Sequence, residues 1–264
     1  MKTCKANGRS ELNDKDIEKV LNFLREYQDL YGNNLFVDRE RIESIAGEFP
    51  DLPGEPNTKP SKPVAKVREK KMTKPADSPL WNFKRKIENC KNCALGNTRT
   101  KFVFGSGSEH ADIMFIGEAP GAEEDRTGIP FVGRAGKLLD RLLSQIQLKR
   151  DDIFIANILK CRPPNNRDPL PDEVAQCIPY LHRQIELIQP KVIVALGRIA
   201  AQNLLRSTAS LKQMRGRLWQ YRGVDMIVTY HPAAILRNAG LLTVATEDFK
   251  FIRETYREIL KRQN

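Results

Sequence analysis

The sequence lacks the features that would place it in or across a membrane. Its 264 residues contain no run of 18 or more apolar residues, and the N-terminal stretch MKTCKANGRS has no apolar segment of the signal-peptide type. Histidine is scarce, with three in the whole chain, so candidates for acid–base chemistry at neutral pH are few. We therefore expect a cytoplasmic protein with no membrane partner.

Positive charge is what the chain has in excess. Lys and Arg number 44 against 33 acidic residues, which gives a formal net charge of +11. A balance of this sign favours a polyanionic partner, and nucleic acid is the leading class. Charge alone does not separate DNA from RNA or from an anionic membrane.

Composition divides the chain into three parts. Residues 50–79 are crowded with proline and lysine and predict a flexible linker. Within it, residues 59–74 carry seven Lys or Arg and one Glu. This basic run either contacts DNA phosphates or only keeps the linker soluble. Residues 1–49 have apolar positions at helical spacing and predict a small helical module. Residues 80–264 are expected to form the main domain.

The main domain alternates short apolar runs with amphipathic helical patterns. Apolar residues recur every three or four positions in residues 138–146 and 174–188, as on one face of a helix. This alternation predicts an α/β fold with three layers (α/β/α), in which helices cover both faces of a four-stranded parallel sheet. The predicted strands are residues 113–116, 153–158, 192–196 and 226–229.

Three loops that follow these strands have unusual sequences. In an open α/β sheet, ligands bind beyond the carboxyl ends of the strands, so chemistry is expected in such loops. The first loop reads GEAPGAEED and continues through PFVGRAG to residue 136. The second carries Asn157 followed by CRPP at 161–164, and the last reads HPAAILR at 231–237.

Five cysteines in an apparently cytosolic chain predict metal ligands rather than disulfides. Cys90 and Cys93 form a CxxC pair, whereas Cys161 and Cys177 are separated by fifteen residues. Four thiolates suit zinc or a cubic iron–sulfur cluster, and the wide spacing of the second pair favours the cluster. Cys4 has no partner in this scheme and is predicted to be a free thiol.

Together these loops resemble the family 4 uracil-DNA glycosylases. The GEAPG turn, the PFVGRAG segment, the NxxKCRPP segment and the HPAA loop follow the order of that family over residues 89–238. The resemblance implies an enzyme that flips uracil out of single- or double-stranded DNA and hydrolyses its N-glycosidic bond, which initiates base excision repair. It implies no nucleotide cofactor, and we expect a monomer. It also implies a 4Fe-4S cluster held by Cys90, Cys93, Cys161 and Cys177.

The resemblance assigns a uracil pocket to the three loops. Phe131 is expected to stack on the flipped base. The Asn157 amide matches the donor and acceptor pattern of uracil and mismatches cytosine. Glu124, by similarity, stands where the methyl group of thymine would lie. The predicted uracil-binding residues are Glu118, Ala119, Pro120, Glu124, Phe131, Asn157 and His231.

Two residues are predicted to be catalytic. His231 is expected to donate a hydrogen bond to uracil O2 as negative charge develops there. Many uracil glycosylases have an aspartate at the position of Ala119, so the neighbouring Glu118 is predicted to position or activate the attacking water. The alternative for Glu118 is a role in ordering its loop.

The remaining predictions concern DNA. Ile235 and Leu236 are expected to wedge into the gap left by the flipped base. Basic side chains on the same rim are expected to contact phosphates, with Lys160 among them. The arginines predicted to bind DNA are Arg134, Arg162, Arg167 and Arg237.

Two rival functions remain open at this point. One is a glycosylase for another deaminated base such as hypoxanthine, which Asn157 and Glu124 would decide because they set the polarity and size of the pocket. The other is a non-catalytic DNA- or RNA-binding iron–sulfur protein, which Ala119 motivates. A structural protein that binds zinc is a weaker third reading.

Overall fold

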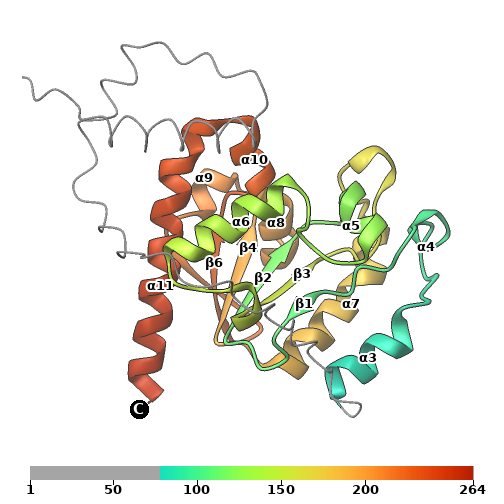
Figure 1. The fold of residues 1–264 in the computed structure, drawn as a ribbon, viewed down its shortest axis with the longest axis horizontal. Coiled ribbons are helices and arrows are strands. Elements are labelled where there is room, and N and C mark those ends of the chain that lie inside the picture. Colours follow the sequence, from blue (N-terminus) through green and yellow to red (C-terminus); the bar gives the residue numbers. More distant parts are fainter. Residues whose placement is uncertain (1–77, 264) are drawn as a thin grey trace, which may run out of the picture. The chain divides into compact units, whose positions relative to one another are not determined.

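The computed structural model of this protein describes residues 78–263 (Figure 1). The predicted helical module at 1–49, nearly all of the predicted linker and Cys4 therefore lie outside the described residues. The first described helix, α3 (Pro79–Ile87), begins one residue before the predicted start of the main domain.

Four parallel strands form the centre of the sheet. They are β2 (Ile113–Gly117), β3 (Phe154–Asn157), β4 (Val192–Leu196) and β6 (Val224–Thr229), in the spatial order β3-β2-β4-β6. Every residue of β2, β3 and β4 is buried, as expected for parallel strands covered on both faces. The predicted four-stranded parallel sheet is confirmed, with strand ends that differ by at most two residues.

The sheet also has two antiparallel edge strands, which were not predicted from the sequence. β1 (Ser106–Gly107) pairs with β3, and β5 (Leu218–Tyr221) pairs with β6. The full order is β1-β3-β2-β4-β6-β5. β1 has only two residues, and the side chains of β5 are exposed or half-buried, so neither strand leaves an apolar run in the sequence.

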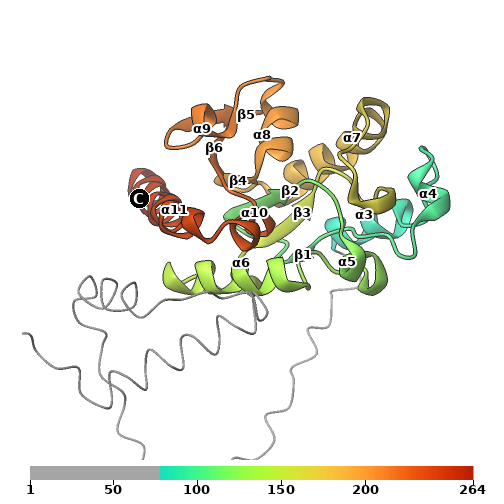
Figure 2. The same ribbon diagram turned by 90° about the horizontal axis from the view of Figure 1, so that it is seen from above.

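Helices cover both faces of the sheet, which confirms the three-layer architecture (Figure 2). Met114 and Ile116 of β2 pack into one apolar core with helices α3, α7, α8 and α9, whereas Ile113 and Phe115 pack into the other with α6, α10 and α11. The bounds of these helices, after α3, are α6 (Arg134–Gln145), α7 (Pro171–Ile188), α8 (Arg198–Leu205), α9 (Leu211–Met214), α10 (Pro232–Arg237) and α11 (Leu242–Gln263).

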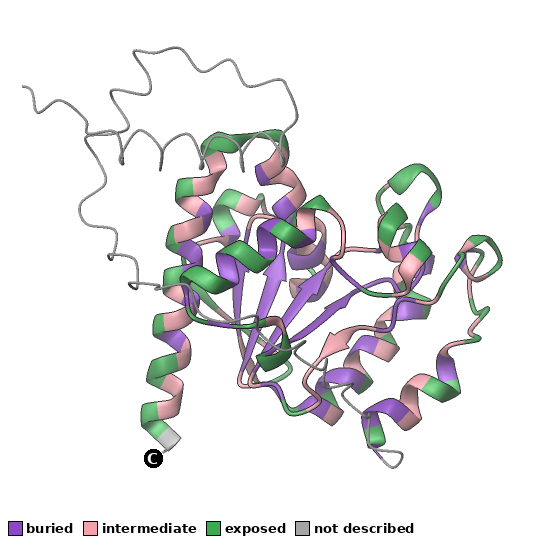
Figure 3. Cartoon of the chain, viewed as in Figure 1, coloured by how far each residue is buried: buried purple, intermediate pink, exposed green. Residues whose placement is uncertain are grey.

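The helices carry the burial pattern that their sequences predict. Each long helix buries one stripe against the sheet and exposes the opposite face, while the central strands β2, β3 and β4 are buried throughout (Figure 3). Within the described part of the chain, no helix is both long and apolar enough to span a bilayer. Short helical elements complete the fold: α4 (Leu95–Thr98), α5 (Ala122–Thr127), η1 (Arg150–Asp152), η2 (Pro164–Asn166) and η3 (Ala239–Leu241).

Candidate active site

A cavity of about 660 Å³ lies at the carboxyl ends of the parallel strands. This is the edge at which an open α/β sheet is expected to bind its ligand. Asn157 ends β3 and Leu196 ends β4, and both line the cavity. All seven residues predicted to bind uracil also line it: Glu118, Ala119, Pro120, Glu124, Phe131, Asn157 and His231.

Phe131 and Asn157 both lie against Gly117, because this glycine has no side chain. A Cβ atom on Gly117 would lie 2.3 Å from Asn157 Oδ1 and 2.9 Å from the Phe131 ring. Asn157 is 1% exposed, and its Oδ1 has no hydrogen-bond partner within the protein. A buried acceptor without a partner costs free energy, so this atom is available for a ligand N–H group.

The loop that carries Phe131 is held by long-range hydrogen bonds. The Arg150 guanidinium donates to the carbonyl oxygens of Pro130 (3.0 Å) and Phe131 (2.6 Å). Gly136, in the first turn of α6, passes so close that a Cβ atom there would lie 1.7 Å from the Phe131 oxygen. Phe131 itself has φ +53°, an uncommon backbone conformation for a bulky residue, which these contacts maintain.

Glu124 braces the same loop from the other side. Its carboxylate accepts hydrogen bonds from the backbone N–H groups of Gly121 (3.1 Å), Val132 (3.0 Å) and Gly133 (3.2 Å). The side chain also lines the cavity, as exclusion of thymine would require. That role of Glu124 stays a prediction. The contacts show that Glu124 joins α5 to the Phe131 loop, a role that was not predicted from the sequence.

His231 is the N-cap of α10, and this fixes its tautomer. Its Nδ1 accepts a hydrogen bond from the Ala233 backbone N–H at 3.1 Å. Burial, with a smaller contribution from Arg237, lowers the pKa of His231 to about 4. The ring is therefore neutral at pH 7 with its proton on Nε2. The ring centroid lies 5.4 Å from that of Phe131.

Burial and several neighbouring charges act together on the pKa of Glu118. Burial, followed by the negative charge of Asp168, raises the pKa of Glu118 to about 7, while Arg198 and Arg237 act in the opposite direction. Asp168 and Arg198 line the cavity and form an ion pair of 3.3 Å with each other. Neither residue was predicted from the sequence, because Asp168 lies after a proline-rich loop and Arg198 begins a helix with no distinctive motif.

The four predicted metal ligands converge at a second place. Cys90, Cys93, Cys161 and Cys177 all line one small cavity, and none of them forms a disulfide. They come from the segment between α3 and α4, from the loop after β3 and from α7. Within residues 78–263, no three or more His, Cys, Asp or Glu side chains are arranged to hold a single metal ion.

Several donors point at these sulfur atoms. Tyr180 donates its hydroxyl proton to Cys90 Sγ (3.1 Å), and the Lys160 backbone N–H points at Cys177 Sγ (3.3 Å). Arg99 Nη1 lies 3.5 Å from Cys161 Sγ. Burial raises the pKa of Cys161 and raises that of Cys177 to about 12, so both thiols must release protons when a metal binds.

Comparison with known proteins identifies the family. The sequence profile of the Uracil DNA glycosylase superfamily matches residues 104–259. A type-4 uracil-DNA glycosylase from Sulfurisphaera tokodaii is 48% identical to this chain over 66% of it and 84% of its own length. One from Archaeoglobus fulgidus is 47% identical over 66% of this chain and 92% of its own length.

The chain belongs to the type-4 uracil-DNA glycosylases. A type-5 uracil-DNA glycosylase from Pyrobaculum aerophilum is less similar, at 33% identity over 59% of this chain and 72% of its own length. The resemblance that the loop motifs indicated is therefore confirmed at the level of the family.

In this type-4 glycosylase, two of the predicted DNA contacts are placed in the protein interior. Ile235 is 0% exposed and packs in the core with α6, so its prediction as a DNA wedge is wrong. Lys160 is also 0% exposed and cannot lie on a phosphate-binding rim. Leu236 is half-buried against the same core as Ile235, and its wedge role stays a prediction.

The four predicted DNA-binding arginines are accessible to different degrees. Arg237 and Arg167 line the active-site cavity, although Arg167 is also paired with Glu173 at 2.6 Å. Arg162 is half-buried and donates to Asn166 Oδ1 at 2.8 Å. Arg134 is exposed at the start of α6.

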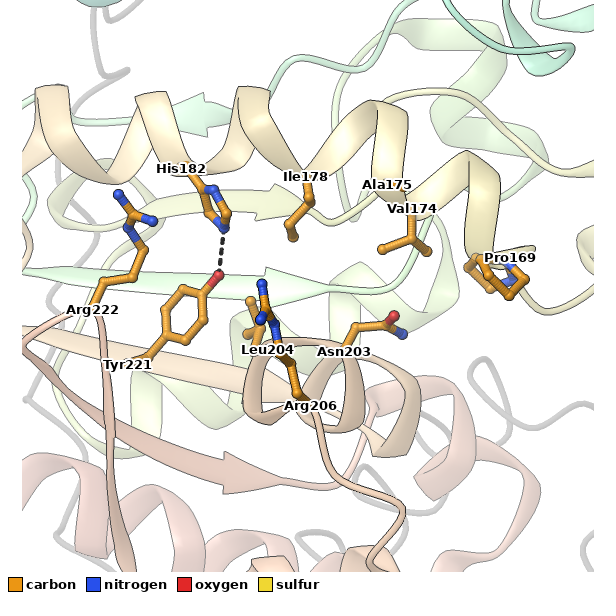
Figure 4. Close-up of a pocket in the computed structure, with 11 residues that line it drawn as sticks. Pro169, Val174, Ala175, Ile178, His182, Asn203, Leu204, Arg206, Tyr221 and Arg222 are labelled. Atoms are coloured by element: carbon orange, nitrogen blue, oxygen red, sulfur yellow. Dashed lines mark hydrogen bonds between the residues drawn. The ribbon is translucent and has the colours of Figure 1, made fainter.

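A separate cavity of about 500 Å³ lies between α7 and α8 (Figure 4). Its middle is lined by apolar residues together with Asn203 and Arg206, and at one end the His182 ring and the Tyr221 hydroxyl form a hydrogen bond of 2.8 Å. Burial lowers the pKa of His182 and raises that of Tyr221. None of the residues that the family resemblance assigns to the glycosylase site lines this cavity.

Proposed function

We propose that this protein excises uracil from single- or double-stranded DNA as a monomer, leaving an abasic site that initiates base excision repair. The observation that carries the proposal is the unpaired Oδ1 of Asn157, buried in a cavity beside Phe131 and His231. A flipped uracil supplies the missing partner, because its N3–H group donates to this oxygen while its O4 accepts from the Asn157 amide. Phe131 stacks on the ring.

Replacement of Asn157 by aspartate tests this reading of the base. A carboxylate keeps the acceptor and loses the NH2 donor, so it leaves uracil O4 unpaired and matches the amino group of cytosine. An unsatisfied buried polar group costs about 1–3 kcal/mol, so we expect kcat/KM for uracil to fall by roughly 10- to 100-fold. Oligonucleotides with a single uracil or cytosine measure both rates. A variant with unchanged uracil excision and no cytosine excision would contradict the role of Asn157.

Bond cleavage develops charge at two places, and the cavity has a group for each. The C1′–N1 bond breaks, and the departing uracil takes negative charge on O2, to which His231 Nε2–H donates. Positive charge builds on the sugar, and water attacks C1′ and releases a proton. The Glu118 carboxylate positions this water and accepts the proton.

DNA reaches the site along the rim of the cavity. Arg237 and Arg167 contact phosphates closest to the flipped nucleotide, and Arg134 and Arg162 contact phosphates farther from it. Leu236, the partly exposed neighbour of buried Ile235, enters the space that the flipped base leaves.

The four cysteines hold a 4Fe-4S cluster. Each iron of such a cluster binds one cysteine, whereas zinc gathers its ligands at about 2.0–2.3 Å around one ion. Four cysteines that line one cavity can supply the four thiolates of such a cluster, and the wide spacing of Cys161 and Cys177 along the chain favours the cluster over zinc. Its role is structural: it joins the segment before β1 to α7 and to the loop after Asn157. Cysteines that serve as metal ligands rather than as disulfides fit a reducing, cytoplasmic compartment.

Removal of one ligand tests the cluster. We expect Cys177→Ser to lose the brown colour and visible absorbance of an iron–sulfur protein and to unfold at a lower temperature, because the metal bonds stabilise only the folded chain. Cys4→Ser, which changes a cysteine outside the four, serves as the matched control and should keep both properties. Metal analysis separates iron from zinc. Full iron content in Cys177→Ser would contradict the ligand assignment.

Excision itself is measured on labelled oligonucleotides that carry one uracil, cytosine, thymine or hypoxanthine, with alkaline cleavage of any abasic product. We expect cleavage at uracil alone. Cleavage at hypoxanthine would extend the substrate class. DNA binding without cleavage, by protein with an intact cluster, would show that Ala119 marks a lost activity.

A further inference from the structure

Lys160 is a buried cation whose side chain contacts the base-reading residue. It is 0% exposed, and its Nζ donates to the main-chain oxygen of Asn157 at 2.7 Å. The second donation goes to Gln184 Oε1 at 2.6 Å. Burial lowers the pKa of Lys160 to about 8, with the neighbouring cysteines acting in the opposite direction.

Gln184 extends this contact across the domain. It lies on α7, is 0% exposed, and donates through Nε2 to the Phe104 main-chain oxygen at 2.8 Å. The Val103 backbone N–H returns a hydrogen bond to the Lys160 main-chain oxygen at 2.9 Å. Lys160 and Gln184 therefore connect the end of β3 to α7 and to the segment before β1.

The end of β3 is fixed from two sides as a result. On the β2 side, the N–H groups of Ile158 and Leu159 donate to the main-chain oxygens of Gly117 and Glu118, each at 3.0 Å. On the side away from β2, Lys160 Nζ binds the main-chain oxygen of Asn157 itself. The backbone that carries the Asn157 amide is held between these contacts.

Packing alone does not account for a lysine at this position. Burial of an ammonium group is costly unless its donors find partners, and an apolar side chain would fill the same space without that cost. The network in which Lys160 takes part contains the residue that reads the base. We propose that Lys160 is a positioning residue that holds Asn157 in register with the flipped base, an inference that rests on the proposed excision of uracil.

Orientation explains why such a contact affects the rate. Asn157 must present an acceptor and a donor to one edge of the base at the same time, and a misplacement of about 1 Å at a reacting centre can cost on the order of 100-fold in rate. Loss of the Lys160 contact frees the main chain on one side of Asn157. The expected effect is on kcat, with little change in DNA affinity.

The test compares two buried variants in the full-length, cluster-containing protein. Lys160→Met removes the contact with Asn157, and Gln184→Met removes its neighbour in the same network without touching Asn157. Wild-type protein is assayed first on an oligonucleotide with one uracil. Each variant is then measured for kcat, KM, binding of uracil-free DNA, visible absorbance of the cluster and thermal unfolding, with kcat taken well below the unfolding temperature.

We expect both variants to unfold at lower temperature, and Lys160→Met alone to lose roughly 10- to 100-fold in kcat with unchanged DNA binding. Equal kcat values for the two variants would overturn the inference and leave Lys160 a purely structural role. Absence of excision by the wild type would instead reject the proposed function.

The double variant Lys160→Met with Gln184→Met covers the case in which the single lysine variant does not fold. The second replacement removes the Gln184 side-chain oxygen that Lys160→Met alone leaves buried and unpaired, in exchange for the Gln184 contact with the Phe104 main-chain oxygen. Its kcat should remain low, because the main-chain oxygen of Asn157 is still unpaired. A double variant with the kcat of Gln184→Met would contradict the proposal.

Discussion

Replacement of His231 by alanine is expected to slow uracil excision by about 100- to 1,000-fold, the usual cost of removing one donor from a developing oxyanion. The physical reason lies in the tautomer. The Ala233 N–H occupies Nδ1, so the proton of the neutral ring is on Nε2, the nitrogen left for a ligand. Single-turnover rates on an oligonucleotide with one uracil measure the effect. Uracil-free DNA should bind to the alanine variant as tightly as it binds to the wild type.

The matched control separates catalysis from helix capping. Asparagine is a good N-cap, so His231→Asn should keep the start of α10 intact while its shorter side chain fails to reach uracil O2. We therefore expect Asn and Ala variants to be equally slow but different in stability. A fast His231→Asn variant would show that capping, rather than hydrogen bonding to the base, is what the reaction needs.

The same residue has a signature in stability against pH. Its folded pKa of about 4 lies below the ordinary histidine value near 6.5. The unfolded chain therefore takes up a proton at His231 before the folded chain does, and the contribution of His231 to stability is lost as pH falls from about 6.5 to about 4. His231→Asn should lack this part of the acid destabilisation, which thermal unfolding at several pH values will measure.

The sequence predicted the elements that leave a local signal. The four parallel strands are continuous apolar runs, and the loops after them carry motifs with fixed spacing, so the cavity and its seven predicted residues came together as expected. β1 and β5 left no such signal. Ile235 and Lys160 were misplaced because spacing gives the order of residues along a loop, not the direction in which each side chain points.

Contacts between distant segments were beyond sequence reasoning. Arg150 supports Phe131 from nineteen positions along the chain, and nothing in its own surroundings marks it. Asp168 changes the electrostatics of Glu118 from a different loop. Such residues act through geometry that only the folded chain defines, and they need no motif of their own.

Glu118→Gln is expected to reduce excision by about 100-fold or more, within the range of general base catalysis, and to remove a pH dependence that the wild type shows. Burial and Asp168 raise the pKa of Glu118 to about 7, so the carboxylate form increases as pH rises through 7. Because the ionised form is the one that accepts a proton from water, the wild-type rate should rise over the same interval. The excision rate of the glutamine variant should be low and should not change with pH over this interval.

Asp168→Asn provides the control, because it leaves Glu118 in place and removes a negative charge that raises its pKa. The rise in rate should then move to lower pH, whereas a step that stays near pH 7 would assign the titration to another group.

Glu118 has a folded pKa above its unfolded value, so its effect on stability is favourable at low pH and is lost as pH rises through about 7. At pH 8 the Glu118 carboxylate is ionised although it is partly buried and near Asp168, and this lowers the stability of the wild type. Glu118→Gln should therefore be more stable than wild type at pH 8, as expected where a residue is kept for catalysis at a cost in stability.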